Sequence, residues 1–281
     1  MAVATIPVRR VLSRTVLYVV ALAVLALILV PLVYAVLGGF RTTGQIAERP
    51  VGLPDPWIFT NYLGTLRSPA FWRQVWNSTF IALATTLLIL PLSSLAAFAL
   101  ARYRFRGREA IYTFFTIGLL YPVVAATLPL WLTLRDLDLL GNPWGVILPQ
   151  VAFGLPLSIV ILRPFFRNIP DDLEDAAIID GCGPLRFYWH VMLPLSRPAL
   201  STISVLTIVG SWNAFLLPLL VLTRQDQWTL PLGVNNISTQ YGTDTALVLA
   251  YTVLSIVPAL ILYAIAERHI VSGVTSGAVK G

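Results

Sequence analysis

Six long runs of apolar residues dominate the sequence, and each is long enough to cross a lipid bilayer as a helix. A helical residue rises about 1.5 Å, so roughly 20 residues span a hydrocarbon core of about 30 Å. Only 11% of the 281 residues are charged, whereas soluble domains carry about 25%. We therefore predict an all-α polytopic membrane protein with a single transmembrane domain over residues 1–281. The six predicted spans are 16–39, 76–101, 110–134, 145–165, 199–222 and 244–266.

The first apolar run follows Arg9, Arg10 and Arg14, an arrangement that also occurs in secretory signal peptides. The apolar stretch of a signal peptide is shorter, however, at about 7–15 residues. We therefore predict that this run is an uncleaved membrane helix.

Basic residues outside the spans predict which side of the membrane each connection faces. Short cytoplasmic connections carry more Arg and Lys than connections on the other side. Of the 19 basic residues, 13 lie on one set of alternating connections and 6 on the other. The richer set includes both termini and the loop 167–198, which we therefore place in the cytoplasm. The excess of basic residues therefore indicates how the chain is oriented in the membrane. We expect membrane lipid but no nucleic acid as a partner.

The chain cannot hydrolyse ATP by P-loop chemistry. That chemistry needs a lysine in a glycine-rich loop, and the single lysine is Lys280, at the end of the sequence. If the chain is a transporter, its energy must then come from another polypeptide or from an ion gradient. Ion-driven carriers often place charged side chains within their spans, and the predicted spans are nearly free of charge. The pattern therefore disfavours a gradient-driven carrier, which is the alternative from a different class.

Residue counts also disfavour an enzyme or a metal site. An intramembrane hydrolase would need a pair such as Ser–His at membrane depth, and neither His190 nor His269 lies in a predicted span. The two histidines are far apart in sequence, and Cys182 is the single cysteine. No metal-ligand cluster is expected, and an intrachain disulfide is impossible. We predict a non-enzymatic chain without a cofactor or metal of its own.

The loop 167–198 combines a dense acidic cluster with strong helix signals. Asp171 is placed to cap a helix, and Glu174 three residues later makes a capping-box-like pair. Acids in a first helical turn suit the positive end of the helix dipole. A helix that rests on a membrane surface usually has a Lys/Arg-rich polar face, so an acidic helix favours contact with another protein. The cluster comprises Asp171, Asp172, Glu174, Asp175 and Asp180.

Glycine and proline divide this loop into two helices. Gly181 is placed to end the first helix, and Gly183-Pro184 is placed to break the chain and start the second. The second helix is predicted to run through about Met192 and to stop before Pro194. Its predicted apolar stripe is Leu185, Trp189 and Met192.

The order of residues in this loop resembles the EAA motif of ABC-importer permeases. That motif reads Glu-Ala-Ala, three residues, Gly, nine residues, Ile, one residue and Leu-Pro. The matching positions here are Asp175-Ala176-Ala177, Gly181, Val191 and Leu193-Pro194, with Asp replacing Glu and Val replacing Ile. Three further segments resemble the maltose-type carbohydrate branch of that family: Asn77-Ser78, Ser211-Trp212-Asn213 and the tail 276–281.

This resemblance implies the transmembrane domain of a type I ABC importer, in a bacterial or archaeal inner membrane. It implies a permease subunit that forms part of the path for a sugar or oligosaccharide. It also implies a second permease subunit, a dimeric ATPase that binds ATP and magnesium, and an extracytoplasmic solute-binding protein. An ABC permease for another solute, such as an oligopeptide or a polyamine, is the alternative within transport.

The resemblance places the contact with the ATPase in the segment 171–194. Either Glu174 or Asp175 is then the acid that meets the ATPase. The coupling residues that it implies are Asp171, Glu174, Asp175, Ala176, Ala177, Asp180, Gly181, Leu193 and Pro194.

A polar segment within the fifth predicted span is the candidate for the solute path. An unpaired amide in hydrocarbon is costly, so we expect Asn213 to face protein or a watery cavity. An amide suits the hydroxyls of a sugar and an aromatic ring suits its apolar face, and Asn213 with Trp212 supplies both. The alternative is an interhelical hydrogen bond beside a packing aromatic. The other candidates are the neighbouring Ser211 and, more weakly, Tyr121, Trp131 and Gln150.

Overall fold

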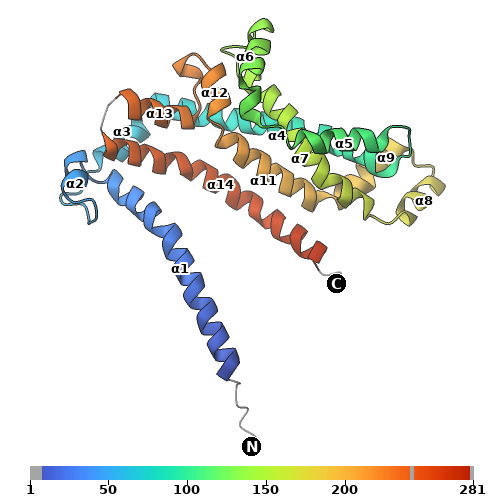
Figure 1. The fold of residues 1–281 in the computed structure, drawn as a ribbon, viewed down its shortest axis with the longest axis horizontal. Coiled ribbons are helices and arrows are strands. Elements are labelled where there is room, and N and C mark those ends of the chain that lie inside the picture. Colours follow the sequence, from blue (N-terminus) through green and yellow to red (C-terminus); the bar gives the residue numbers. More distant parts are fainter. Residues whose placement is uncertain (1–7, 241–243, 279–281) are drawn as a thin grey trace, which may run out of the picture. The chain divides into compact units, whose positions relative to one another are not determined.

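The structure is a computed structural model that describes residues 8–240 and 244–278. Within these ranges the chain consists of helices and their connections, without a β-strand (Figure 1). The long helices are α1 (Val8–Gly39), α4 (Pro69–Arg102), α7 (Trp144–Arg167), α11 (Arg197–Trp212) and α14 (Thr245–Ala278). The shorter segments are α2 (Thr43–Glu48), α3 (Thr60–Arg67), α5 (Arg108–Gly118), η1 (Val123–Ala126), α6 (Thr127–Asp136), α8 (Asp172–Ile179), α9 (Pro184–Phe187), the π-helical turn η2 (Tyr188–Met192), α10 (Leu193–Leu195), α12 (Leu216–Val221), η3 (Gln225–Gln227) and α13 (Leu230–Gln240).

Each predicted span coincides with a helical region of the chain. Three helices are long and apolar enough to cross a membrane unbroken: α1 from Val16 onward, α4 and α7. Two more candidates are bent pairs, in which α5 meets the segment 123–136 at 91° and the segment 184–195 meets α11 at 75°. In α14, the stretch Thr245–Ile261 is an apolar helix that is shorter than a full span among the residues searched.

Two of the predicted spans are wrong as single helices. The predicted span 110–134 breaks after Gly118, because Pro122 has no N–H to donate and disfavours a helical conformation in the residue before it. The predicted span 199–222 breaks after Trp212, where the Asn213 amide donates to the Val209 carbonyl at 2.9 Å and competes with the backbone bonds of the helix. α12 resumes at Leu216.

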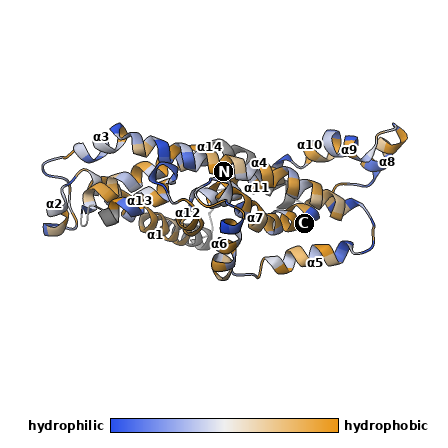
Figure 2. Cartoon of the chain, turned by 90° about the horizontal axis from the view of Figure 1, so that it is seen from above, coloured by the Kyte–Doolittle hydropathy of each residue, from blue (hydrophilic) through white to orange (hydrophobic). Residues whose placement is uncertain are grey.

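Apolar side chains cover the surface of α1. Figure 2 colours this helix mostly as hydrophobic, and none of its apolar window is buried within the described structure. Leu27, for example, is 77% exposed. Keeping so much apolar surface in water would be unfavourable, so α1 is typical of a helix that contacts lipid or another membrane chain.

The described residues within 8–68 and 236–254 form one compact unit. Asn61 of α3 donates to the carbonyls of Gly39 (3.1 Å) and Arg41 (3.0 Å), and this fixes α3 to the end of α1. Within the same unit, the Thr43 hydroxyl donates to the Asp244 carboxylate at 2.9 Å. A cluster of aromatic rings fills the turn between these helices: Phe40, Trp57, Phe59 and Tyr62.

Residues 69–235 and 255–281 form the second unit. Its main packing is between α4 and α7, with α11 against both and α5 against α7. Close approach of α4 and α7 depends on small residues, since Ser93 and Ala97 are fully buried and Gly154 faces the tip of Ile89. The larger core side chains include Phe98, Leu162, Phe166, Tyr188 and Met192.

A buried arginine ties α4, α5 and α7 together at one end of this unit. The Arg163 Nε of α7 donates to the Leu100 carbonyl of α4 at 3.0 Å, and its guanidinium pairs with Glu109 of α5. The guanidinium also lies over the Tyr112 ring, 3.9 Å from its centroid. The carbonyl, the carboxylate and the aromatic ring together compensate the buried positive charge.

The pair Asn77-Ser78 joins the other part of α4 to a distant turn. Asn77 donates to the carbonyls of Asp226 (2.9 Å) and Trp228 (3.0 Å). The Ser78 hydroxyl accepts from the backbone N–H of Leu230 at 2.9 Å. These side chains therefore hold the segment 226–230 against α4.

Candidate functional site

The acidic cluster forms the first turn of α8, as the sequence predicts. Asp172, Glu174 and Asp175 all lie in that turn, where negative charge suits the helix dipole. The predicted capping box is wrong, because Asp171 holds the capping position but its side chain makes no capping bond. Instead the Asp171 carboxylate pairs with the guanidinium of Arg102. The guanidinium offers this carboxylate a partner of opposite charge, which a backbone N–H at the cap does not.

Arg102 is the last residue of α4, and its side chain is only 3% exposed. Its Nη2 donates to the Ile169 carbonyl at 2.6 Å, and its Nε lies 3.8 Å from the Glu174 carboxylate. Burial raises the pKa of Glu174; the Arg102 charge opposes this rise, and the Asp171 and Asp175 charges add to it. The Glu174 side chain is only 22% exposed and faces the protein, whereas Asp175 is exposed.

Gly181 ends α8 through a complete Schellman motif. The Gly181 N–H donates to the Ile178 carbonyl at 2.9 Å, and the Cys182 N–H donates to the Ala177 carbonyl at 2.8 Å. Gly181 has φ +73°, the left-handed conformation that side chains disfavour. Cys182 and Ala177 both pack against the hydrophobic core. The predicted elbow is therefore present, and it sets the direction of the chain between α8 and α9.

The second predicted helix starts at Pro184, as expected, but it does not stop before Pro194. It continues through the π-helical turn η2 into α10. The predicted apolar stripe is confirmed only at Met192, which is buried together with Phe187, and it is wrong at Leu185 and Trp189, which are exposed. In a π turn, residues five apart are bonded neighbours, so Phe187 and Met192 share the face that meets the core. Periodicity of 3.6 residues could not reveal this shift.

The acidic loop thus presents apolar side chains that the rest of the described chain does not cover. Ile178 is 62% exposed, Ile179 is 85% exposed and Trp189 is 56% exposed. Asp175, Ala176 and Asp180 are also exposed, Ala177 and Leu193 are half-buried, and Pro194 is exposed. Exposed apolar side chains with polar residues around them are typical of a protein-binding surface. We refer to Ile178, Ile179, Leu185 and Trp189 as the exposed apolar residues of the loop.

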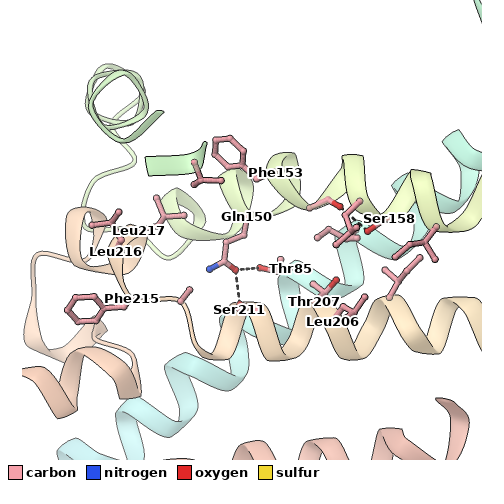
Figure 3. Close-up of a pocket in the computed structure, with 18 of the residues that line it drawn as sticks. Thr85, Gln150, Phe153, Ser158, Leu206, Thr207, Ser211, Phe215, Leu216 and Leu217 are labelled. Carbon is pink, nitrogen blue, oxygen red and sulfur yellow. Dashed lines mark hydrogen bonds between the residues drawn. The ribbon is translucent and has the colours of Figure 1, made fainter. Parts of the chain in front are cut away.

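A second candidate site is a cavity of about 440 Å³ between α4, α7 and α11. Gln150 lies in its wall, and its amide oxygen accepts from the hydroxyls of Ser211 (2.7 Å) and Thr85 (3.1 Å) (Figure 3). The amide nitrogen lies on the other side of the group, is buried and has no hydrogen-bond partner among the described residues. A buried donor without a partner is costly, so this nitrogen is suited to a ligand oxygen. None of the described lining residues is ionisable.

The cavity includes some of the predicted path residues and leaves out others. Gln150 and Ser211 line it, but Trp212 is not among the described lining residues and is 3% exposed. Asn213 is exposed, and its amide donates to its own helix end. Tyr121 and Trp131 are not among the described lining residues either. The segment Ser211-Trp212-Asn213 lies at the end of α11, because the helix breaks there.

Most residues of the cavity wall are not predicted from the sequence. Thr85, Ser158 and Thr207 line it, and each is a hydroxyl residue in an apolar run. That signal is weak, since such hydroxyls usually bond their own helix, as Ser158 does with the Gly154 carbonyl at 2.9 Å. Phe153 and Phe215 also line the cavity and carry no polar signal.

Comparison with known proteins identifies the family of this chain. Residues 89–271 match the family described as binding-protein-dependent transport system inner membrane component. The chain belongs to this family. The predicted location of the permease in the inner membrane is confirmed by this match. A binding-protein-dependent transport system also argues against the alternatives of a gradient-driven carrier and an intramembrane hydrolase.

Three curated relatives resemble the permease over most of their length. The diacetylchitobiose uptake system permease protein NgcG of Streptomyces coelicolor is 35% identical and is covered over 84% of its length by 89% of this chain. The arabinooligosaccharides transport system permease protein AraQ of Halalkalibacterium halodurans is 33% identical, and the match covers 91% of AraQ and 89% of this chain. The trehalose transport system permease protein SugB of Mycobacterium tuberculosis is 35% identical, and the match covers 84% of SugB and 82% of this chain.

A solved structure supports the predicted fold class. A chain of a bacterial ABC transporter, described as involved in the import of the acidic polysaccharide alginate, superposes with a TM-score of 0.78 at 25% identity. The match covers 95% of the permease and 99% of that chain. The permease therefore has the all-α transmembrane fold of ABC importers, as the sequence predicts.

Proposed function

We propose that this permease is one subunit of an ATP-driven importer for a sugar or oligosaccharide. It forms part of the solute path and binds a separate ATPase through residues 171–194. A second, different permease subunit completes the path, and an extracytoplasmic binding protein delivers the solute. ATP and magnesium bind to the ATPase dimer. Both termini and the acidic loop lie in the cytoplasm on the basis of the Arg and Lys distribution.

The acidic loop is the observation that carries this proposal. α8 is held at its start by Arg102 and at its end by the Gly181 motif, so it is a braced helix. Ile178 and Ile179 of this braced helix, and Trp189 of η2, are exposed without cover from the described chain. An ATPase surface that accepts these side chains would bury them and move α8 when it closes. That movement would rock the spans between inward-open and outward-open states.

The geometry favours Asp175 over Glu174 as the acid that meets the ATPase. Asp175 is exposed on α8, whereas Glu174 is half-buried beside Arg102. A residue committed to an internal pair has less freedom to bind a partner.

A sugar is the solute class that the relatives and the cavity favour. The names of NgcG, AraQ and SugB refer to saccharides. The cavity offers an amide, hydroxyls and the ring of Phe153, and its described lining holds no charge. Such a wall suits hydroxyls and apolar ring faces, and it suits a polycation poorly. A permease for a non-sugar solute is the remaining alternative.

Co-purification and reconstitution test the proposed function. We expect the tagged permease, purified from its native host, to carry a second permease subunit and an ATPase. In vesicles that also contain the binding protein, uptake of neutral oligosaccharides should require ATP and magnesium. A permease that purifies without an ATPase, or uptake driven by an ion gradient alone, would contradict the proposal.

Reversing the charge at Asp175 should weaken binding of the ATPase. Asp175→Lys places a cation where the interface is proposed to use an anion, and a buried charge reversal can cost several kcal/mol, with less at a rim. Recovery of the ATPase with tagged permease measures the effect. Asp136→Lys changes the net charge equally at an exposed site outside the loop and should recover wild-type amounts. Equal recovery with both variants would remove Asp175 from the interface.

Removing the amide of Gln150 should weaken solute binding in the cavity. Gln150→Leu keeps the approximate size but deletes the free donor, and losing one hydrogen bond costs about 0.5–1.5 kcal/mol. We expect the half-saturation for uptake of a neutral disaccharide to rise about two- to tenfold with unchanged assembly. Asn213→Ala deletes an amide outside the cavity and should leave half-saturation unchanged. The reverse pattern would favour the path predicted from the sequence, through Asn213 and Trp212.

A further inference from the structure

Arg102 connects three parts of the chain through a single guanidinium group. It pairs with Asp171 at the start of α8, and its Nη2 donates to the Ile169 carbonyl in the segment that leads into α8. The same nitrogen lies 4.0 Å from the Met192 sulfur, on the returning arm of the loop. Both arms of the acidic loop therefore meet the end of α4 at this one side chain.

The surroundings of Arg102 suit a side chain with both the positive charge and the shape of a guanidinium group. The side chain is 3% exposed, so its desolvation must be offset by partners. Those partners are two carboxylates, Asp171 and Glu174, and one carbonyl, and the C-terminal end of α4 also favours a cation. A neutral side chain of similar length would lose both ion pairs and leave Glu174 half-buried without its counter-charge.

α4 continues from this connection directly to the cavity. The helix has Arg102 at its end, and Thr85 and Ile89 of the same helix line the cavity. Thr85 also donates to Gln150 of α7. If α4 moves as a rigid helix despite Pro91 within it, a displacement of its end would also displace groups in the cavity wall.

We propose that Arg102 is the positioning residue that makes α8 and α4 move as one body. Movement of α8 by the ATPase then reaches the cavity through α4, in addition to the covalent route through α7. This inference rests on the proposed function, because it needs an ATPase that acts on α8.

Arg163 provides a matched comparison within the same unit. It is also buried, pairs with the exposed carboxylate of Glu109 and donates to a carbonyl of α4. Its described partners, however, lie on α4 and α5, and none lies in the acidic loop. Loss of Arg163 should therefore lower stability without separating α8 from α4.

The test follows access to the cavity rather than solute uptake, so it needs no identified solute. A cysteine reporter is placed by Thr207→Cys in a Cys182→Ala background, since Thr207 lines the cavity. The assembled complex with its ATPase is reconstituted in vesicles. The labelling rate by a membrane-impermeant maleimide is then compared without nucleotide and after trapping with ATP, magnesium and vanadate.

We expect trapping to change the labelling rate at least about fivefold when Arg102 is present. Arg102→Gln should reduce that change to less than about twofold while the complex still hydrolyses ATP. Arg102→Lys, which keeps the cation, should restore part of it. Arg163→Gln and the exposed Arg104→Gln should keep the full change. The double variant Asp171→Asn/Glu174→Gln removes the same ion pairs from the other side and should behave as Arg102→Gln, including where Arg102→Gln assembles poorly.

Each outcome decides between distinct conclusions. A full nucleotide-dependent change in Arg102→Gln, or an equal loss in Arg163→Gln, overturns the role of Arg102 and leaves the proposed function intact. A wild-type complex that lacks an ATPase, or whose labelling does not respond to nucleotide, overturns the proposed function and this inference with it.

Discussion

Uptake should collapse in Gly181→Val although the protein still inserts and packs. The elbow after α8 needs φ +73° at this position, which costs an L-residue about 1–2 kcal/mol and is least accessible to a β-branched side chain. An added Cβ would meet nothing within 4 Å, so the strain is in the backbone alone. Strain of this size shifts the population of the correct elbow by about 5- to 30-fold. Saccharide uptake at matched expression measures the loss.

Gly183 is a matched control two residues away. It also has open space around its Cα, but its φ of −71° suits any residue. Gly183→Val should therefore retain most of the uptake. Gly181→Asn should lie between the two, because Asn tolerates the left-handed region better than Val. Normal uptake by Gly181→Val would show that coupling does not depend on this elbow.

Gly145→Ala should sharply reduce the amount of folded protein. In most helices this substitution stabilises by about 0.5–1 kcal/mol. Here the new Cβ would lie inside contact distance of the Leu139 backbone carbonyl and 2.8 Å from the Val221 side chain. Backbone cannot move aside as a flexible side chain can, and overpacking of a well-packed core costs about 1–3 kcal/mol. The clash therefore outweighs the helical preference.

Thermal stability of the purified permease measures this effect. Gly210→Ala is the control, because Gly210 is also helical but has nothing within 4 Å of an added Cβ. We expect a lowered midpoint and yield for Gly145→Ala, and an unchanged or raised midpoint for Gly210→Ala. Equal midpoints for the two variants would contradict the close packing at the start of α7.

Structural features that follow from long apolar runs or from the backbone limits of single residues could be predicted from the sequence alone. Apolar runs of bilayer length predicted the membrane helices, because burying backbone in lipid forces it to hydrogen-bond within each helix. Gly181 and Pro184 predicted the break and restart after α8, because their backbone limits are intrinsic. The spacing from Asp175 to Pro194 resembled a family motif, and family membership is now established.

Contacts between distant residues were decided by the tertiary structure. The sequence neighbours of Asp171 predict a cap, but its partner is Arg102 of α4. The stripe Leu185, Trp189 and Met192 assumes a regular helix, whereas η2 changes which face meets the core. The role proposed for Gln150 depends on its neighbours in the folded chain. Thr85 and Ser211 donate to its amide oxygen, and its amide nitrogen is left without a partner among the described residues. Backbone preferences act within a few residues, so they can be predicted from the sequence. Ion pairs, burial and cavity walls depend on which helices pack together, and only the tertiary structure decides this.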